Sequence, residues 1–462
     1  MNLILVKEKS FYKLLLTLGL PMAVQGLVSF AINMTDVLMV QLVGENELGA
    51  CTIASLPFVV FFFVISGVSG GACMVCSQYY GRGDMPAIKK VVAVALNAIL
   101  LIGGCLSLIL AFFPRGVMQL LTHDQVLVGI GAQYLKIVAP TYVLTGFVAT
   151  YMLVMRSIGE VRFALLLEIV TLLLNIFLNY LLIFGRLGFP AMGVQGSACA
   201  TLVARGVAFL LCIWFLEKKE EKLGFRLRDL FAKKQGVAKR LFRDIYAVVV
   251  GEFLWGLGLA MNNVVFSKTG SKELIAAISE VSVFMQFSVV FIVGFATAVE
   301  VIVGQLIGRG EQKKLPAVVR TVVLVALGVG IFSAGLTLLV RDPILNMGKL
   351  SVGTKALASR LIGINAVVLL FLAVSSTCMT GLLRGGADTK GVLVIDTLSL
   401  WFFAVPLAWV GLHLFKWAPV VVYFCTRVDV FVKLVFAFVR LKIGGWAKEV
   451  THIPSEGILH EQ

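Results

Sequence analysis

Charged residues are scarce in this sequence. Of its 462 residues only 14% are Asp, Glu, Lys or Arg, whereas 59% are hydrophobic. A soluble globule cannot hide so much apolar surface, so the composition excludes a soluble protein and predicts one whose solvent is the lipid bilayer. The period-two alternation of a membrane β-barrel is also absent, and the apolar segments are far longer than barrel strands.

Histidine is scarcer still, and the cysteines form no complete metal-binding pattern. Among the eight cysteines only Cys73 and Cys76 have the spacing of metal ligands, and no second pair or nearby histidine completes a site. We expect two packed thiols, no metal site and no cofactor. No histidine lies deep in an apolar segment; the four are His123, His413, His452 and His460. Without a nucleophile and base or a set of metal ligands, a membrane-embedded enzyme is disfavoured.

Twelve long apolar segments are present. Most reach about 20 residues, enough for a helix to cross roughly 30 Å of hydrocarbon. They cover residues 14–40, 53–79, 91–113, 133–155, 163–185, 194–216, 246–267, 276–307, 317–340, 361–383, 391–413 and 417–439. Pro21, Pro140 and Pro406 are candidates for kinks, because proline lacks the amide hydrogen that a helix needs. We predict an all-α integral membrane protein with twelve transmembrane helices.

The two halves of the chain repeat each other. The turn Gln78–Asp84 returns as Gln305–Glu311, at an offset of 305 − 78 = 227 residues, and the junction Arg156–Arg162 returns as Arg384–Lys390, at an offset of 384 − 156 = 228. Lobes of six spans each start on the same side of the membrane, which predicts parallel repeats around a central binding site. The predicted parts are a first lobe 1–216, a linker 217–245, a second lobe 246–440 and a tail 441–462.

The net charge of +15 follows the membrane topology. With both termini in the cytosol, most Lys and Arg residues fall on the cytosolic side, as the positive-inside rule requires. The stretch from Glu217 to Asp244 holds ten basic and five acidic residues, and we interpret it as a solvated linker near anionic lipid headgroups rather than a nucleic-acid site. The predicted location is the cell membrane.

A carboxylate inside a span needs a partner or a function, because its insertion costs about 2.5 to 3.5 kcal/mol. Asp36 lies in the outer half of the first span and can bind a proton or, with oxygen partners, a sodium ion. In the fifth span, Asn175 and Asn179 are four residues apart, so both amides project from one helix face. We predict that these three residues form an ion-coupling site, although an interhelical polar clamp is an alternative for the asparagines.

The second lobe carries its own acid. Glu252 lies in the inner third of the seventh span, near Trp255, and is expected either to meet a cationic substrate or proton or to act as an anchor. Glu300 in the eighth span has no evident partner in the sequence.

Other charged residues within spans suggest ion pairs. Glu168 and Asp396 are repeat equivalents, since 396 − 168 = 228, and Arg205 and Arg427 correspond in kind. We therefore predict structural pairs of Glu168 with Arg205 and of Asp396 with Arg427. Asp429 and Lys433 are four residues apart on one span and are expected to neutralise each other.

These motifs together resemble the multidrug and toxic compound extrusion (MATE) transporters along essentially the whole chain. The shared features are Leu20-Pro21-Met22 with Asp36, the two Gln-x-x-Gly-x-Gly turns, Asn175-x-x-x-Asn179-Tyr180, the segment Gly193–Thr201 and the segment Leu383–Lys390. The resemblance implies a V-shaped pair of six-helix lobes that exports organic, often cationic, compounds in exchange for inward H⁺ or Na⁺. It also implies that Asp36 couples transport to the ion, with Asn175 and Asn179 beside it and Glu252 as the second-lobe candidate.

The chain departs from parts of this family. One branch has an acid at the position of Asn179, and other members carry an acid in the body of the tenth span that is absent here. With one charge beside the asparagines, H⁺ is favoured over Na⁺. A lipid-linked oligosaccharide flippase of the wider superfamily is the alternative, but it needs a cationic cavity, and the intramembrane bases are expected to be answered by acids. We expect a monomer with a drug-like substrate in contact with membrane lipids.

Overall fold

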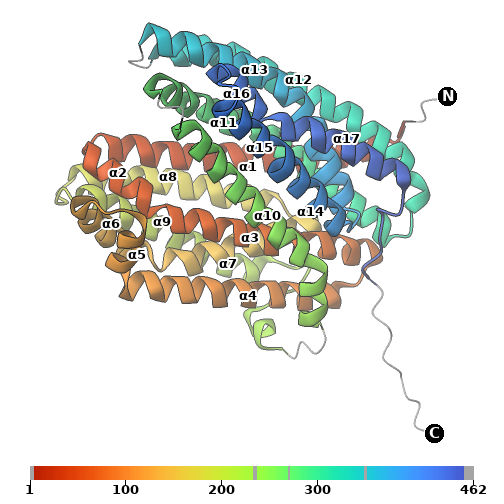
Figure 1. The fold of residues 1–462 in the computed structure, drawn as a ribbon. Helices are drawn as coiled ribbons and strands as arrows, with labels where there is room; N and C mark the ends of the chain where they lie inside the picture. The colour runs from red at the N-terminus through yellow and green to blue at the C-terminus, as the bar shows by residue number, and fades with distance from the viewer. Residues whose placement is uncertain (1–4, 233–236, 269–270, 348–350, 452–462) are drawn as a thin grey trace.

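The computed structural model describes residues 5–232, 237–268, 271–347 and 351–451, and within them the regular structure is helical (Figure 1). The first half of the chain forms one bundle. Its helices are α1 Lys9–Gln41, α2 Glu45–Ala54, α3 Leu56–Arg82, α4 Met85–Phe112, α5 Pro114–Leu121, α6 Gln125–Val138, α7 Thr141–Ser157, α8 Arg162–Phe184 and α9 Gly193–Trp214.

The second half forms the other bundle. Its helices are α10 Val237–Ser267, α11 Lys272–Gly308, α12 Leu315–Met347, α13 Val352–Ser376, α14 Thr389–Thr397, α15 Val405–His413, α16 Pro419–Cys425 and α17 Val428–Ile443. Short π- or 3₁₀-helical turns lie at Phe215–Lys219, Leu227–Phe231, Gln312–Lys314, Thr377–Arg384 and Leu398–Ala404. We call the bundles α1–α9 and α10–α17 the first and second lobes.

The lengths of these helices match a bilayer. In the described ranges ten helices are long and apolar enough to cross a membrane. The count is eleven if the bent pair α6 and α7 is taken as one span. The bend of 52° lies at the predicted break around Pro140. The segment predicted as the twelfth span is built from α16 and α17, which are separated at Thr426 and Arg427. The all-helical membrane fold is therefore confirmed, and the segment predicted as the twelfth span consists of two shorter helices.

The repeated turns end and restart helices by the same local chemistry. Gly83 and Gly310 have positive φ angles of 81° and 73°, which glycine adopts without the steric cost of a β-carbon. After the first turn, the Asp84 carboxylate caps α4 by accepting a hydrogen bond from the Ala87 amide at 3.0 Å. After the second turn, Glu311 instead pairs with Lys314 at 2.7 Å.

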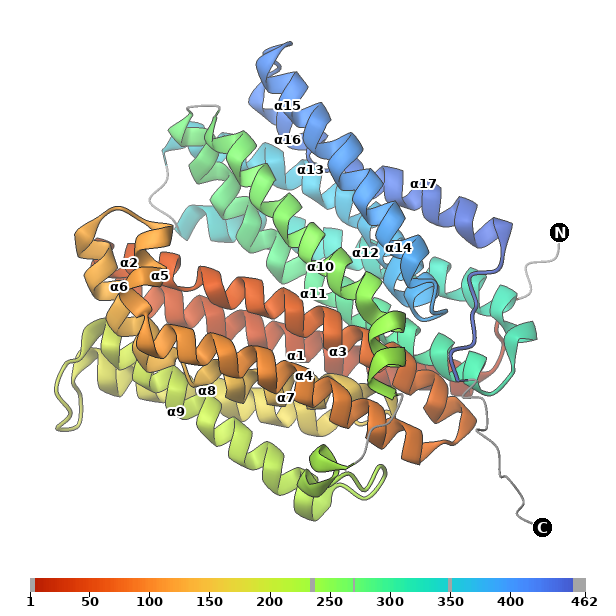
Figure 2. The ribbon, with the colours of Figure 1, turned by 60° about the horizontal axis from the view of Figure 1, so that its bottom comes forward.

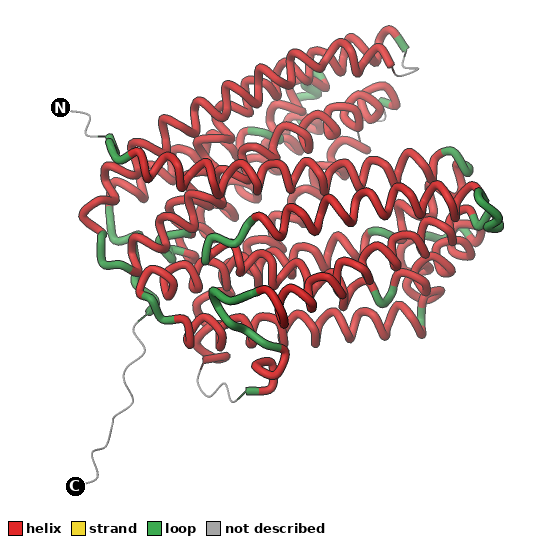
Figure 3. The backbone as a smooth tube through the Cα atoms, turned by 180° about the vertical axis from the view of Figure 1, so that it is seen from behind, coloured by secondary structure: helices red, strands yellow, loops and turns green. Residues whose placement is uncertain are grey.

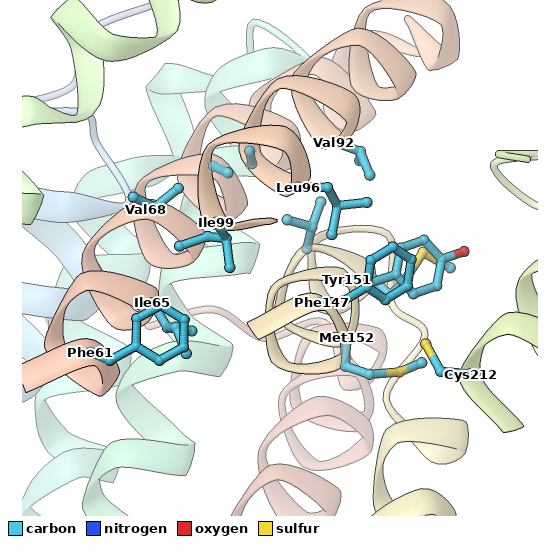
Figure 4. Packing of buried hydrophobic residues seen from close by; sticks show 14 of the residues in the cluster. Phe61, Ile65, Val68, Val92, Leu96, Ile99, Phe147, Tyr151, Met152 and Cys212 are labelled. Atoms are coloured by element: carbon cyan, nitrogen blue, oxygen red, sulfur yellow. The ribbon is translucent and has the colours of Figure 1, made fainter. Parts of the chain in front are cut away.

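The core of the first lobe lies where α3, α4, α7 and α9 meet. Figure 4 shows Phe61, Leu96 and Phe147 in this cluster, with Tyr151 and Cys212 beside them. All five are at most 2% exposed. Because helices in a bilayer gain no hydrophobic advantage by meeting each other, such close van der Waals packing is what holds the bundle together.

The two lobes meet through α1, α3, α10 and α11. Both ends of the described chain lie at one end of the molecule, which we call the terminal end, and the lobes diverge toward the opposite end (Figures 1 and 2). In the terminal half, glycines allow the backbones to approach closely. A β-carbon on Gly67 would lie 2.6 Å from the Val249 Cα, and one on Gly71 would lie 2.6 Å from the Ile245 Cβ. The structure is therefore closed at its terminal end.

The segment between the lobes differs from the solvated linker expected. Phe225 is fully buried against the first lobe, and Asn97 of α4 donates a hydrogen bond to the Leu230 carbonyl at 3.0 Å. The Glu220 carboxylate accepts hydrogen bonds from the amides of Leu223 and Phe225. Apolar residues among the basic ones thus fold part of the linker onto the lobe. The backbone view in Figure 3 shows the loops gathered at the two ends of the helices.

Candidate functional site

The three predicted coupling residues lie together in the first lobe. Asn179 on α8 donates one hydrogen bond to the Asp36 carboxylate of α1 at 2.5 Å and another to the Asn175 side-chain oxygen at 3.2 Å. Asn175 and Asn179 are buried, and the Asn179 side-chain oxygen has no hydrogen-bond partner. The i, i+4 spacing on α8 thus places both amides beside a carboxylate from a helix more than 130 residues away in sequence.

The predicted pair of Glu168 with Arg205 is wrong. No ion pair joins them, and one Glu168 carboxylate oxygen is buried without a hydrogen-bond partner. Their depths explain the difference, since Glu168 lies two turns from the terminal end of α8 while Arg205 lies near the middle of α9. The charge of Arg205 instead acts on Asp36, and the charge that acts on Glu168 is that of Arg156.

The second lobe contains a buried cluster centred on Arg384. Its guanidinium donates two hydrogen bonds to the Glu300 carboxylate, both at 2.9 Å, and one to Glu252 at 3.2 Å. Glu300 is 1% exposed. The guanidinium also lies against the first lobe, because a β-carbon on Gly70 of α3 would be 3.7 Å from it. Glu300 therefore has a partner, and Glu252 is part of an ion-pair network rather than a lone acid.

The internal repeat could have identified Arg384. Subtracting the repeat offset maps Glu252 onto Gln25 (252 − 227 = 25) and Arg384 onto Arg156 (384 − 228 = 156). In the structure Arg156 donates a hydrogen bond to Gln25 at 2.8 Å, so both lobes make the same contact. Glu300 maps onto Cys73 (300 − 227 = 73), which carries no carboxylate. The second-lobe copy of this site is therefore charged, and the first-lobe copy contains one cation and no acid in direct contact.

Trp255 lies at the contact between the lobes. Its ring meets that of Phe63 of α3 edge to face, with centroids 5.9 Å apart. The residue is 40% exposed, so part of its apolar surface is accessible.

The predicted pair of Asp396 with Arg427 is also wrong, whereas that of Asp429 with Lys433 is confirmed. Lys433 bridges Asp396 at 3.0 Å and Asp429 at 3.2 Å. Arg427 sits at the break between α16 and α17, which turns its side chain back over the Tyr423 ring at 5.4 Å and lets it donate a hydrogen bond to the Tyr423 hydroxyl at 3.3 Å. The expectation that an acid pairs with every intramembrane base is therefore wrong for Arg427.

The cysteines that were weighed as metal ligands are free thiols. Cys73 and Cys76 are buried, and no group of three or more potential metal ligands occurs within the described ranges.

Two bundles of membrane-length helices, related by an internal repeat and meeting around buried charged groups, define the class of this molecule as a multi-pass membrane transporter with duplicated lobes. The MatE family model matches residues 21–181 and 247–410, one region in each lobe. The chain belongs to this family, the MATE transporters, and is therefore a transporter and not an enzyme.

Similar proteins from other organisms match most of this chain. It is 25% identical over 418 residues to the "Probable multidrug resistance protein NorM" of Thermotoga maritima, covering 87% of this chain and 86% of the relative. It is 26% identical over 417 residues to the "Multidrug resistance protein PmpM" of Pseudomonas aeruginosa, covering 88% and 84%.

Solved structures share the fold. A MATE family transporter described as outward-facing superimposes with a TM-score of 0.85 at 18% identity, covering 95% of this chain and 97% of that chain. A transporter of the MOP superfamily from Pyrococcus furiosus gives the same TM-score, identity and coverage.

Proposed function

We propose that this protein is a secondary antiporter that exports organic, cationic or amphiphilic compounds across the cell membrane in exchange for inward H⁺. The names of its relatives support a drug-like substrate. The observation that carries the coupling proposal is the Asp36 carboxylate held by Asn179 inside the first lobe. A carboxylate at this depth is the expected position for a site that takes up an ion on one side and releases it on the other.

Asn179 is suited to both protonation states of Asp36. Its amide nitrogen donates to the carboxylate, while its side-chain oxygen is buried and has no partner. An asparagine amide can turn over and present its oxygen instead, so the same side chain can accept a hydrogen bond from a protonated carboxyl group. Asp36 is also the one carboxylate in the site, which favours H⁺ over Na⁺ as the coupling ion. No cofactor is needed for this exchange.

The second lobe has a different role in this proposal. Glu252 is already bonded to Arg384, so it is less available for an ion than Asp36. Trp255, on the same helix one turn further, offers an exposed aromatic face that suits an organic cation. We propose that Glu252 and Trp255 contribute to substrate recognition, and that the protein works as a monomer surrounded by lipid.

The charge pattern supports a topology with the terminal end in the cytosol. In that orientation the closed terminal end makes this structure an outward-facing state, in which Asp36 lies toward the extracellular half of α1.

Efflux of a fluorescent cationic dye from proteoliposomes tests this proposal. Wild-type protein should move the dye when a pH gradient is imposed in sodium-free buffer, and protein-free vesicles provide the control. Efflux driven by a Na⁺ gradient at equal, clamped pH would reverse the choice of ion. Absence of efflux under both gradients, for a panel of organic cations, would contradict the antiport proposal.

A further inference from the structure

The described part of the C-terminal tail runs across the junction of the lobes. Residues 444–451, which we call the strap, follow α17 at the terminal end of the molecule. Gly444 and Gly445 have φ angles of 84° and 69°, so two left-handed residues turn the chain sharply. Trp446 is buried and packs onto Gly386, where a β-carbon would lie 2.5 Å from its ring. The repeat equivalent of Gly386 in the first lobe is Ile158 (386 − 228 = 158). Of the two equivalent positions, the glycine is therefore in the lobe onto which Trp446 packs.

One set of bonds fastens the strap to the second lobe. The Lys448 amide donates to the Gly386 carbonyl at 2.8 Å, and the Lys448 ammonium donates to the Asp388 carboxylate at 2.5 Å. Arg440 of α17 donates to the other Asp388 oxygen at 2.6 Å. The Asp388 side chain is 2% exposed, so its charge is buried and answered by two cations.

The first lobe has a related contact. Glu160, the repeat equivalent of Asp388 (388 − 228), pairs with Lys222 of the segment between the lobes. In each lobe, therefore, the acid of the duplicated junction holds a lysine from the segment that follows the last span of that lobe.

A second set of bonds fastens the strap to the first lobe. The buried Gln78 side chain of α3 donates to the Lys448 carbonyl at 3.0 Å and accepts from the Val450 amide at 2.9 Å. Arg82 donates to the Thr451 carbonyl at 3.1 Å. A single amide thus satisfies both a donor and an acceptor of the strap backbone.

The repeat shows that these bonds replace a direct contact between the lobes. Gln305, the equivalent of Gln78, reaches across from the second lobe and donates to the Ser157 carbonyl of the first lobe at 2.8 Å. Symmetry would direct Gln78 to Gly385 (157 + 228) in the second lobe. Gln78 binds the strap instead, so one of two equivalent cross-lobe bonds is made through the tail.

We propose that the strap is a lock on the terminal end of the transporter, which holds the two lobes closed there and must release Gln78 and Arg82 before that end opens. Its bonds to both lobes exist in the closed state and are lost in the open one, so they shift the equilibrium between the two states toward the closed one. The interpretation of this opening as access to the cytosol rests on the proposed function. The lock itself can be tested without substrate or ion gradient.

Two native cysteines report separately on opening and on unfolding. Cys73 on α3 is buried among residues of α1 and α11, in the cluster that joins the lobes. Cys212 on α9 is buried inside the first lobe. Separation of the lobes at the terminal end should expose Cys73 and leave Cys212 covered, whereas global unfolding should expose both.

The experiment compares maleimide labelling rates of these cysteines in detergent-solubilised full-length protein, followed by mass spectrometry. The first variant is the double substitution Trp446→Ala and Lys448→Ala. The second is a chain that ends after Ile443 and keeps α17 whole. Lys442→Ala is the matched control, because this lysine is exposed and lies before the strap.

Both strap variants should raise the labelling rate of Cys73 about tenfold, a factor that corresponds to about 1.4 kcal/mol. Cys212 and the Lys442→Ala control should keep wild-type rates. An unchanged Cys73 rate in both variants would overturn the lock. Equal increases at Cys73 and Cys212 in both variants would also overturn it, since the strap would then support the fold rather than the closed state. If the labelling rates change as expected but dye efflux is absent, the antiport proposal is contradicted and the lock is not.

Discussion

The buried cluster of Arg384, Glu300 and Glu252 makes a quantitative prediction. Arg384→Gln removes the one cation in direct contact with two acids, whereas Glu300→Gln leaves Arg384 paired with Glu252. Breaking a buried ion pair typically costs about 3 to 5 kcal/mol, mostly because a charge is left without its partner. We expect Arg384→Gln to fall at the upper end of this range and Glu300→Gln at or below the lower end.

The double variant distinguishes pairing from general damage. If Glu300 and Arg384 act as a pair, the combination of Glu300→Gln with Arg384→Gln should destabilise less than the sum of the two single changes, by about 1 to 3 kcal/mol. Equilibrium unfolding in mixed micelles gives the three free energies, with wild-type protein as the reference. Additive losses, or a larger loss for Glu300→Gln than for Arg384→Gln, would refute this reasoning.

Three further predictions follow from the topology and the other ion pairs. In a cysteine-free background, Glu45→Cys should react with an impermeant reagent from outside and Asp84→Cys should not; the opposite pattern would reverse the orientation. Lys433→Gln should lower the heat-denaturation midpoint more than Arg427→Gln, because Lys433 is paired with two aspartates, of which Asp429 is buried, whereas Arg427 forms no ion pair with any described residue; equal effects would contradict this. Burial alone raises the pKa of Asp388, but hydrogen bonds and charges from its two cationic partners hold the pKa below its ordinary 3.8. Its stabilisation is therefore complete above that ordinary pKa and is lost as pH falls through the lowered value, so wild-type stability should approach that of Asp388→Asn below about pH 4. A difference that persists or grows in acid would contradict the assignment.

The sequence predicted the parts of this molecule that depend on local pattern or on the repeat. Membrane-length apolar segments predicted the helices, and the four-residue spacing of Asn175 and Asn179 predicted their shared face. That Asp36 lies beside them was predicted from family resemblance and span position, and the structure brings the three side chains together.

Contacts between distant helices were predicted less well. The pairs of Glu168 with Arg205 and of Asp396 with Arg427 were chosen by charge and neighbouring spans, but ion pairing also depends on depth and on helix breaks. A break at Thr426 and Arg427 turns the arginine toward Tyr423 and leaves Lys433 to pair with Asp396. Such a break changes the direction of a side chain without leaving a periodic signal in the sequence.

The role of the tail was not predicted. Residues 444–451 lack helical periodicity and were grouped with the tail, yet their bonds to Gln78 are made by backbone groups that any sequence carries. The signal that could have pointed to them is the glycine at 386, where the other copy has isoleucine.

The coupling role of Asp36 is the central claim, and gradient-driven efflux by Asp36→Asn tests it most directly. Asparagine keeps the size of the side chain and removes its titration. The variant should reach the membrane and bind substrate as wild type does, but dye efflux from proteoliposomes under an imposed pH gradient should fall to the level of protein-free vesicles. Glu252→Gln, measured in parallel, should lose less. Full efflux by Asp36→Asn under the same gradient would contradict the account.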